Sequence, residues 1–373
     1  MNIPPFKLER FFAQYEFNVP YLLCCSDCES LTVQELLELE PDAEDQLHRL
    51  WLGYTESKGH PGLRREIARL YEYISPEQVL IHAGAEEAIF NFMNAMLERG
   101  DHVIVHDPCY QSLRDVATAI GCETTKWTGQ EQDRWELDLE FLRQQIKRNT
   151  RAIIINCPHN PTGYLMDLQK FQQVIQIARE CNLLLFSDEV YRGLEYNQDD
   201  QLPAACDLYE NAISLGVMSK TYGLAGLRIG WIATQSQEIY ANMAGFKDYT
   251  SICSSAPSEL LAIVALRHKD HLIQRNRVIV LNNLRYLNNF FYTYQHLFDW
   301  TAPKAGPIAF PRLKADQDIE AFCLDAARKK GVLLLPSNYY DFGNKHFRIG
   351  FGRRNMSEAL EQFDAYLQET YHL

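Results

Sequence analysis

A lysine and an arginine stand eight residues apart in a stretch of small residues. The stretch reads Met218-Ser219-Lys220-Thr221-Tyr222-Gly223 and continues to Gly226-Leu227-Arg228. A lysine amine can form an imine with an aldehyde, and its pKa shifts readily when it is buried, which suits that chemistry. A single lysine is more often a solvated surface charge, so the interpretation of Lys220 depends on the residues that accompany it.

Polar residues that could serve such a lysine follow other short apolar runs. Asp188 comes with Ser187 at the end of the apolar run 183–186, where a carboxylate is costly unless it meets a cation or caps a helix. Asn160 lies between Pro158 and Pro161, in a rigid loop that would aim its amide, although a plain β-turn has the same composition. Tyr110 follows Asp107-Pro108-Cys109 in the same way.

A glycine turn at Gly84 leads straight into a helical pattern. The backbone N–H groups of Ala85 and Glu86 would then lie at a free helix N-terminus, which attracts anions. Many such turns bind nothing. Taken in chain order, however, the anion nest, the aromatic, the asparagine, the acid, the lysine and the arginine match what pyridoxal 5'-phosphate (PLP) requires. These needs are a phosphate cradle, a ring stacker, a donor to the phenolic oxygen, an acid for the pyridine nitrogen and an amine for the aldehyde.

The elements that must position these residues are short buried strands and amphipathic helices. Strand-length apolar runs are predicted at 79–81, 103–105, 152–155, 183–186, 212–215 and 229–233, with helices at 86–99, 139–147 and 168–181. This alternation is typical of a largely parallel sheet covered on both faces, whose ligands bind at the carboxyl ends of the strands. One long helix over 258–294 and a terminal helix over 357–371 indicate a second α+β part.

Bulk properties exclude several classes of function. The chain has 373 residues and a formal net charge of −13, which argues against a nucleic-acid partner because phosphate backbones need a basic surface. No signal peptide or membrane-length apolar run is visible, so we expect a cytoplasmic protein with no membrane partner. Cys24, Cys25 and Cys28 have no nearby Cys or His pair to complete a metal site, and buried thiols are the better interpretation. We therefore expect no metal.

The stretch from about Gly53 to Gly352 resembles the class I/II aminotransferases of the aspartate-aminotransferase type, which are fold type I PLP-dependent enzymes. The Asn160-Pro161-Thr162-Gly163 and Ser219-Lys220 segments carry the most specific part of this likeness. The resemblance implies an α/β fold with a large, mostly parallel, seven-stranded sheet domain flanked by helices, at residues 46–280. It also implies a smaller α+β domain formed by residues 1–45 and 281–373.

The resemblance also implies the roles of the site residues. Lys220 would form the Schiff base with PLP and then act as the general base. Asp188 would pair with the protonated pyridine nitrogen, and Tyr191 and Asn160 would hydrogen-bond the phenolic oxygen. The remaining cofactor contacts would be ring stacking by Tyr110 and a phosphate cup of Ala85, Glu86, Ser219 and Arg228.

Two further segments resemble family segments that bind the substrate and that reach a second subunit. Phe347-Arg348-Ile349-Gly350-Phe351 is similar to the family segment whose arginine binds the substrate α-carboxylate, which implies that role for Arg348 beside Asn160. The stretch from Gly53-Tyr54 to Leu63-Arg64 is similar to the family stretch whose tyrosine reaches the phosphate of the neighbouring subunit. Tyr54 therefore implies a homodimer with shared active sites, acting on an amino acid and a 2-oxo acid.

Two departures from the family pattern bear on specificity. Val217 stands where relatives often have a phosphate-binding serine, and Ser26-Asp27-Cys28-Glu29 replaces the usual Gly-x-Pro-Asp. The second segment resembles the start of PLP enzymes of the capreomycidine-synthase type, which cyclise a hydroxyarginine-like intermediate. We expect Asp27 and Glu29 either to border the pocket and favour cationic donors, or to cap the helix beginning near Thr32.

Transamination is the function that the sequence favours. The alternative is a β-lyase, a replacement enzyme or a cyclising enzyme on the same scaffold, because reaction type depends on small differences in the pocket. A PLP-binding regulatory module is disfavoured, since no basic, helix-turn-helix-like extension precedes Gly53.

Overall fold

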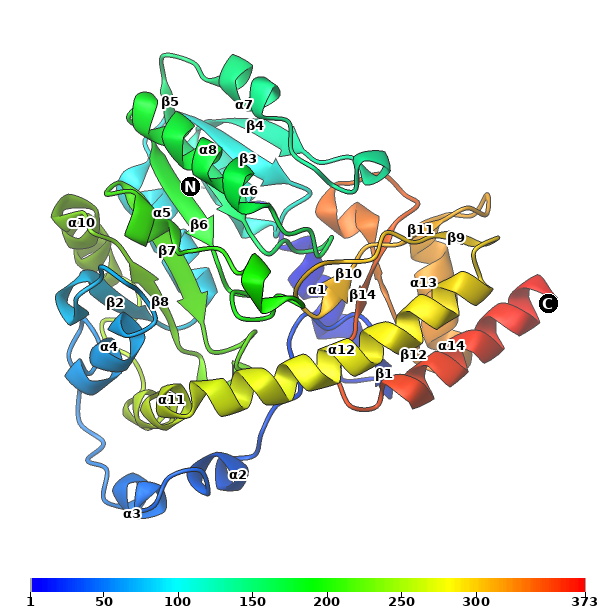
Figure 1. Ribbon diagram of the computed structural model, residues 1–373, viewed down its shortest axis with the longest axis horizontal. Helices are drawn as coiled ribbons and strands as arrows, with labels where there is room; N and C mark the ends of the chain where they lie inside the picture. Colours follow the sequence, from blue (N-terminus) through cyan, green and yellow to red (C-terminus); the bar gives the residue numbers. More distant parts are fainter. Residues whose placement is uncertain (1, 373) are drawn as a thin grey trace.

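The computed structural model describes residues 2–372, and its centre is a seven-stranded sheet (Figure 1). The strand order is β2-β8-β7-β6-β5-β3-β4. The strands are β2 (Val79–His82), β3 (His102–Asp107), β4 (Glu123–Thr128), β5 (Thr150–Asn156), β6 (Leu184–Asp188), β7 (Ala212–Val217) and β8 (Gly230–Ala233). Only β8 runs antiparallel to its neighbours in this sheet. The predicted α/β fold with a mostly parallel, helix-flanked sheet is confirmed.

Helices cover both faces of this sheet because its central strands are apolar on both sides. In β5, Ile154 packs into the cluster under α5, α6 and α10, whereas Ile153 and Ile155 face the cluster under α7 and α8. A third cluster packs α4 and α11 against β2 and β8. These helices are α4 (Pro61–Ala68), α5 (Ala85–Met96), α6 (Ser112–Ile120), α7 (Leu139–Gln145), α8 (Leu168–Glu180), α10 (Gln237–Lys247) and α11 (Ala256–Arg267).

The strand β4 and the helices α4, α6 and α10 of this layer were not among the elements predicted from the sequence. The edge strand β4 has a mostly exposed or half-buried sequence in which only Trp127 is buried, so no apolar run marks it. The helix α6 carries Ser112, Thr118 and charged residues among its apolar positions, which shortens its periodic pattern. An edge strand buries less side-chain surface than a central one, and its sequence signal is weaker for that reason.

The single long helix predicted for residues 258–294 is wrong, because this stretch forms two helices. The first is α11, and the second is α12 (Lys269–Thr293). His268 separates them with φ −108° and ψ 23°, outside the helical region. The buried side chains of α11 hold it against α4, and α12 then runs across to the C-terminal part (Figure 1).

Short strands and two helices make up the C-terminal part. The strands are β9 (Phe298–Asp299), β10 (Ile308–Ala309), β11 (Arg312–Leu313), β12 (Val332–Leu333), β13 (Leu335–Pro336) and β14 (Phe347–Gly350), and the helices are α13 (Ile319–Lys330) and α14 (Met356–Tyr371). The N-terminal segment joins them through β1 (Tyr21–Leu22), which pairs in parallel with β12. The division into residues 46–280 and the rest stays a prediction.

The remaining elements are short. They are α1 (Lys7–Tyr15), α2 (Val33–Leu37), α3 (Ala43–His48), α9 (Ala205–Leu208) and the 3-10 turns η1 (Pro76–Gln78), η2 (Glu131–Asp133), η3 (Gln198–Asp200), η4 (Ala225–Leu227) and η5 (Ser337–Tyr340). None of the helices within residues 2–372 combines the length and the apolar character needed to cross a membrane.

The strand ends that carry the predicted site meet at one edge of the sheet. Asp107, Asn156, Asp188 and Val217 are the last residues of β3, β5, β6 and β7, which run parallel. Their side chains and the loops that follow therefore lie at the same edge of the sheet, on the side where α1 lies (Figure 1).

Candidate active site

A cavity of about 390 Å³ lies at this edge of the sheet. Its floor comes from the strand ends and from the loops after β7, and its other walls come from α1, from residues 25–27 and from Arg348 of β14. The predicted site residues that line it are Ala85, Glu86, Tyr110, Asn160, Asp188, Tyr191, Ser219, Lys220, Arg228 and Arg348. The fold thus brings together all the residues that the sequence assigned to one subunit's site.

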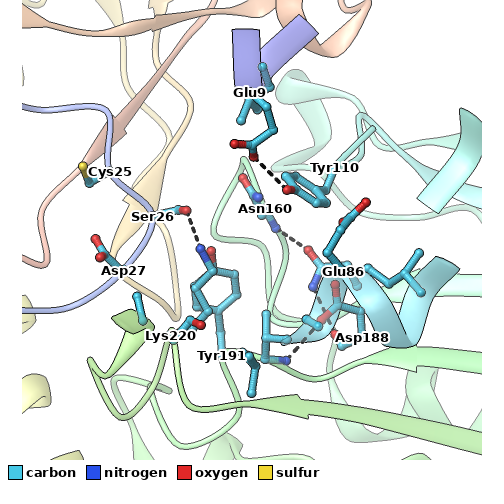
Figure 2. A pocket seen from close by; sticks show the side chains of 18 of the residues that line it. Glu9, Cys25, Ser26, Asp27, Glu86, Tyr110, Asn160, Asp188, Tyr191 and Lys220 are labelled. Carbon is cyan, nitrogen blue, oxygen red and sulfur yellow. Dashed lines mark hydrogen bonds between the residues drawn. The ribbon is translucent and has the colours of Figure 1, made fainter. Parts of the chain in front are cut away.

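The Lys220 amine points into this cavity from the turn after β7. Its Nζ donates a hydrogen bond of 2.8 Å to Oγ of Ser26, a residue of the N-terminal segment (Figure 2). Burial lowers the pKa of Lys220, the charge of Asp27 opposes that shift, and the charge of Arg348 adds to it. A lysine with a lowered pKa carries more of the neutral amine that a nucleophile or a base requires.

The Asp188 side chain lies at the floor of the cavity without a cationic partner. Burial raises its pKa to about 7, and the backbone N–H of Val190 partly offsets this by donating to Oδ1 at 3.2 Å. No lysine, arginine or histidine in the described part of the chain forms an ion pair with it. No helix follows β6 directly, so Asp188 is not a helix cap. An ionised carboxylate in this place needs a cation from a ligand.

A chain of buried hydrogen bonds links the floor to the opposite wall. The Asn156 side chain donates to the backbone oxygen of Asp188 at 3.0 Å and accepts from the backbone N–H of Asn160 at 2.6 Å. Oδ1 of Asn160 accepts from Nη1 of Arg348 at 3.2 Å and from the Tyr340 hydroxyl at 3.0 Å. Because this oxygen faces the arginine, the Nδ2 donor of Asn160 is left for the cavity.

Arg348 is fully buried and is held by three groups. Its Nε and Nη2 both donate to the backbone oxygen of Cys24, at 3.0 and 2.6 Å, and its Nη1 donates to the Tyr340 hydroxyl at 2.7 Å and to Asn160. These contacts fix the plane of the guanidinium. A fixed guanidinium at a cavity wall is suited to binding a carboxylate.

Two tyrosines take different positions in the cavity. The Tyr191 hydroxyl is buried and makes no hydrogen bond of good geometry among residues 2–372, although burial raises its pKa and the nearby Ser26 hydroxyl partly opposes that shift. The Tyr110 hydroxyl instead donates to Glu9 of α1 at 2.9 Å, and its ring lies 5.1 Å from that of Phe6 (Figure 2). An unpartnered buried hydroxyl is costly, so Tyr191 is a strong candidate for contact with a bound ligand.

The predicted anion nest forms at the N-terminus of α5. The backbone N–H groups of Ala85 and Glu86 have no partner within the described chain. Gly84 has φ +93°, and a Cβ there would lie 2.5 Å from Nη2 of Arg228, so the glycine leaves room for the arginine. Arg228 itself adopts φ +52° and donates to the Ser219 hydroxyl at 3.5 Å. Free N–H groups beside a guanidinium make a site for a phosphate.

Three carboxylates border the cavity on the side of the N-terminal segment, from Glu9, Glu16 and Asp27. Glu9 accepts from Tyr110, and Asp27 accepts from Nη2 of Arg353 at 2.9 and 3.0 Å. Glu16 has no hydrogen-bonding or ionic partner for its side chain within residues 2–372. Burial raises the pKa of Glu16, and the charges of Asp27 and Glu9 raise it further.

Glu29 does not border the cavity, so that part of the prediction is wrong. Its Oε2 accepts from the backbone N–H of Arg354 at 2.9 Å, because the segment turns back along β14. Neither Asp27 nor Glu29 caps the helix near Thr32, where Thr32 and Glu35 form the cap themselves. The acidic face that we expected from Asp27 and Glu29 is made instead by Asp27 with two residues of α1.

Tyr54 does not line the cavity of its own subunit. Its side chain is 87% exposed, beside the exposed Trp51 and Leu52. Val217 lines the cavity where a hydroxyl was expected from relatives, so the side chain at this position provides no donor.

Several residues of the cavity were not assigned by sequence reasoning. Asn156 could have been found, since it is a polar residue at the end of a buried strand. Ser26, Tyr340, Glu9 and Glu16 lie in segments far away in the chain, and no spacing relates them to Lys220.

Comparisons with known proteins agree with this arrangement. A family model described as aminotransferase class I and II matches residues 21–363. Capreomycidine synthase of Streptomyces vinaceus is 28% identical, over 94% of this chain and 90% of that protein. An aspartate aminotransferase of Pyrococcus horikoshii is 27% identical, over 87% of this chain and 86% of that protein.

Solved structures give the same result. A PLP-dependent aminotransferase from Streptococcus suis 89-1591 has a TM-score of 0.93 and 32% identity, with 99% of each chain covered. The PLP-dependent cyclase OrfR has a TM-score of 0.91 and 27% identity, covering 99% of this chain and 98% of that one.

The raised pKa of Asp188 predicts a pH-dependent cost to stability in the ligand-free protein. Folding raises this pKa from 3.8 to about 7, so the neutral form is favoured in the folded state. The cost is absent below pH 4, grows as the pH rises to 7 and is complete above it. Replacing Asp188→Asn removes it, and the variant's free energy of unfolding, relative to the unaltered chain, should rise by on the order of 4 kcal/mol between pH 4 and 8.

Urea unfolding of both ligand-free proteins across this range measures the difference. The matched control is Asp270→Asn, whose side chain is 90% exposed and which should show no such trend. A constant difference between the Asp188→Asn variant and the unaltered chain would show that Asp188 ionises freely.

Proposed function

Because the chain belongs to the class I and II aminotransferase family and is a PLP-dependent enzyme, we propose that it moves an amino group from an amino acid to a 2-oxo acid. The observation that carries this proposal is a desolvated amine on Lys220 in the same cavity as the unpaired Asp188 carboxylate and the fixed guanidinium of Arg348. An amine, an acid and a carboxylate site together are what amino-acid chemistry with PLP requires.

The residues of the cavity fit the cofactor on three independent grounds. The unpartnered Tyr191 hydroxyl and the Nδ2 donor of Asn160 suit the phenolic oxygen. The N-terminus of α5, with Ser219 and Arg228, suits the phosphate. Asp188 lacks a cation, and a protonated pyridine nitrogen supplies one; beside that charge the pKa of Asp188 falls and the carboxylate stays ionised. We propose Tyr110 as the residue that stacks on the ring.

The protein's own part in the reaction is binding, orientation and proton transfer. PLP, when bound, withdraws electrons from the substrate Cα, and Asp188 maintains the charge on the ring that this requires. We propose that Nζ of Lys220 takes the Cα proton, for which burial prepares it by favouring the neutral amine. We propose that Arg348 binds the α-carboxylate through its charge and its remaining Nη2 N–H, so that the Cα–H bond faces the amine.

A lyase, replacement or cyclising reaction is the second candidate. It is favoured by the similarity to capreomycidine synthase and to the PLP-dependent cyclase OrfR, each over more than nine-tenths of this chain. Transamination and these alternative reactions start with the same amine and the same cofactor. They differ only in the steps after the proton leaves Cα.

We propose that the preferred donors carry a cationic side chain. Glu16 is half-buried, borders the cavity and has no partner for its charge, and Asp27 and Glu9 add negative potential around it. The cationic residues that border the cavity are Lys220, Arg228 and Arg348, all of which have proposed roles toward the cofactor or the α-carboxylate. A distal carboxylate on the donor would therefore meet repulsion, and a guanidinium or an ammonium would meet attraction.

We propose a homodimer with shared sites. Tyr54 is exposed together with Trp51 and Leu52, and this segment is tied by Thr55, which donates to the backbone oxygen of Ser254 at 3.1 Å. That contact brings it beside the segment of Tyr249 and Ile252, which are 90% and 53% exposed. So much exposed aromatic surface on neighbouring segments is suited to a partner subunit.

A cytoplasmic location is also part of the proposal. All ten cysteines are free thiols, and most of them are buried. Free thiols persist in a reducing compartment.

A donor panel distinguishes the two candidate reactions. With a transaminated donor and no acceptor, the purified holoenzyme should form one 2-oxo acid and one pyridoxamine phosphate per active site. The absorbance of the bound cofactor and the keto product are measured together, with Lys220→Ala as the inactive control. Ammonia released in step with the keto product would instead identify a lyase, and a cyclic amino acid would identify a cyclase.

Replacing Glu16→Gln should lower kcat/KM for arginine and lysine more than for alanine, by about tenfold. A charge-assisted hydrogen bond contributes about 1.5–3 kcal/mol, and the half-exposed Glu16 is expected at the lower end. The matched control is Glu29→Gln in the neighbouring segment, which should leave the ratio of donors unchanged. Equal losses for all three donors in the Glu16 variant would rule out a contact with the donor's side chain.

Mixing two inactive chains tests the shared site. A Lys220→Ala chain and a Tyr54→Phe chain should regain activity on subunit exchange, because a hybrid dimer then holds one site with both defects and one with neither. Activity is followed as the mixture equilibrates, and each parent alone is the control. If activity does not rise although hybrid dimers form, Tyr54 does not serve the partner's site.

A further inference from the structure

We propose that Ser26 is a further catalytic residue whose hydroxyl holds and orients the Lys220 amine while the amine takes the proton from the substrate Cα. The proposal rests on the proposed role of Lys220 and deepens it. Ser26 stands in the segment that departs from the family's usual Gly-x-Pro-Asp stretch.

The contact itself is direct. Nζ of Lys220 lies 2.8 Å from Oγ of Ser26, across 194 positions of sequence (Figure 2). Ser26 is the sole hydrogen-bonding partner of this amine within residues 2–372, and the amine forms no ion pair there. Both side chains border the cavity, so the contact is made at the reacting atom.

Ser26 is held in place by the strand that carries Arg348. The backbone N–H of Gly350 donates to Leu23 at 2.7 Å, and Arg348 donates to the backbone oxygen of Cys24. A Cβ on Gly350 would lie 1.7 Å from the backbone oxygen of Cys25, so the two backbones are in direct contact. The group that orients the amine and the group that binds the carboxylate therefore share one rigid support.

A hydroxyl is suited to this task because its oxygen has lone pairs that accept hydrogen bonds. It accepts an N–H from the amine in both the protonated and the neutral form, so it remains a partner before and after the proton moves to Nζ and leaves the nitrogen lone pair free for the Cα proton. It carries no charge, unlike the carboxylates of Asp27 and Asp188, which raise the pKa of Lys220, and the guanidinium of Arg348, which lowers it. Ser26 thus orients the lone pair of Lys220 Nζ, and most of the lowering of the Lys220 pKa by burial remains.

The first measurement uses the cofactor-free protein, so it does not depend on the reaction. Trinitrobenzenesulfonate labels neutral amines, and peptide mapping follows the labelling of Lys220 as a function of pH. Hydrogen bonds to a charged group are stronger than neutral ones, so Ser26→Ala should lower the pKa of this amine by about one unit, a tenfold change in its acid constant. Ser26→Thr keeps the hydroxyl and should restore the pKa.

The second measurement uses the holoenzyme and a donor deuterated at Cα. In Ser26→Ala, kcat should fall about tenfold with little change in KM, and the primary isotope effect on kcat should rise, because proton transfer becomes slower relative to the other steps. The control is Ser30→Ala, which removes an exposed hydroxyl of the same segment and should change neither quantity.

The outcomes separate this proposal from the proposed function. An unchanged labelling midpoint and an unchanged isotope effect in Ser26→Ala would overturn the role of Ser26, even if the unaltered chain transaminates. A shifted midpoint in a chain that does not transaminate would retain the contact and overturn the reaction. Ser26→Gly, which matches the family pattern, provides a second variant without the hydroxyl and should behave like Ser26→Ala.

Discussion

The site depends on one buried run of hydrogen bonds that starts at the backbone oxygen of Asp188 and ends at Arg348. Asn156 and Asn160 form its middle: Asn156 uses both ends of its side-chain amide, and Asn160 uses its backbone N–H and its side-chain oxygen. Buried polar groups of this kind must all be satisfied, because an unpaired one costs about 1–3 kcal/mol. The run therefore specifies the distance between the floor of the cavity and the arginine, and with it the length of substrate backbone that fits between them.

Burial shifts two pKa values in opposite directions within this frame. It lowers that of Lys220 and raises that of Asp188, because desolvation disfavours whichever form is charged. Both side chains thus become more neutral without a ligand: Asp188 has no cationic partner, and the Lys220 amine meets only the uncharged Ser26 hydroxyl. The same desolvation that destabilises the empty protein therefore favours the loaded one, which is a common trade between stability and function.

The sequence could predict those site residues whose side chains are polar and which lie at or just after the end of a predicted strand. Asp188 ends the buried strand β6, and Asn160 and Lys220 lie in the loops that follow β5 and β7; such positions meet at one edge of a parallel sheet. The edge strand β4 left no apolar signal, and the break at His268 lies in a sequence whose helical period continues across it. Ser26, Tyr340 and Glu16 could not be found, because their places depend on how the N-terminal and C-terminal segments fold over the cavity.

The N-terminal segment is where this chain departs from the family pattern, and its contacts explain how such a departure can change specificity without disturbing the cofactor site. Within five residues it provides the backbone oxygen that holds Arg348, the hydroxyl that meets Lys220 and the carboxylate of Asp27. The phosphate nest, Asp188 and Tyr191 come from the sheet and its loops, and none of them belongs to this segment. A substitution between residues 24 and 28 can therefore alter the base, the carboxylate site and the charge met by a donor side chain, while the residues proposed to hold PLP keep their support from the sheet.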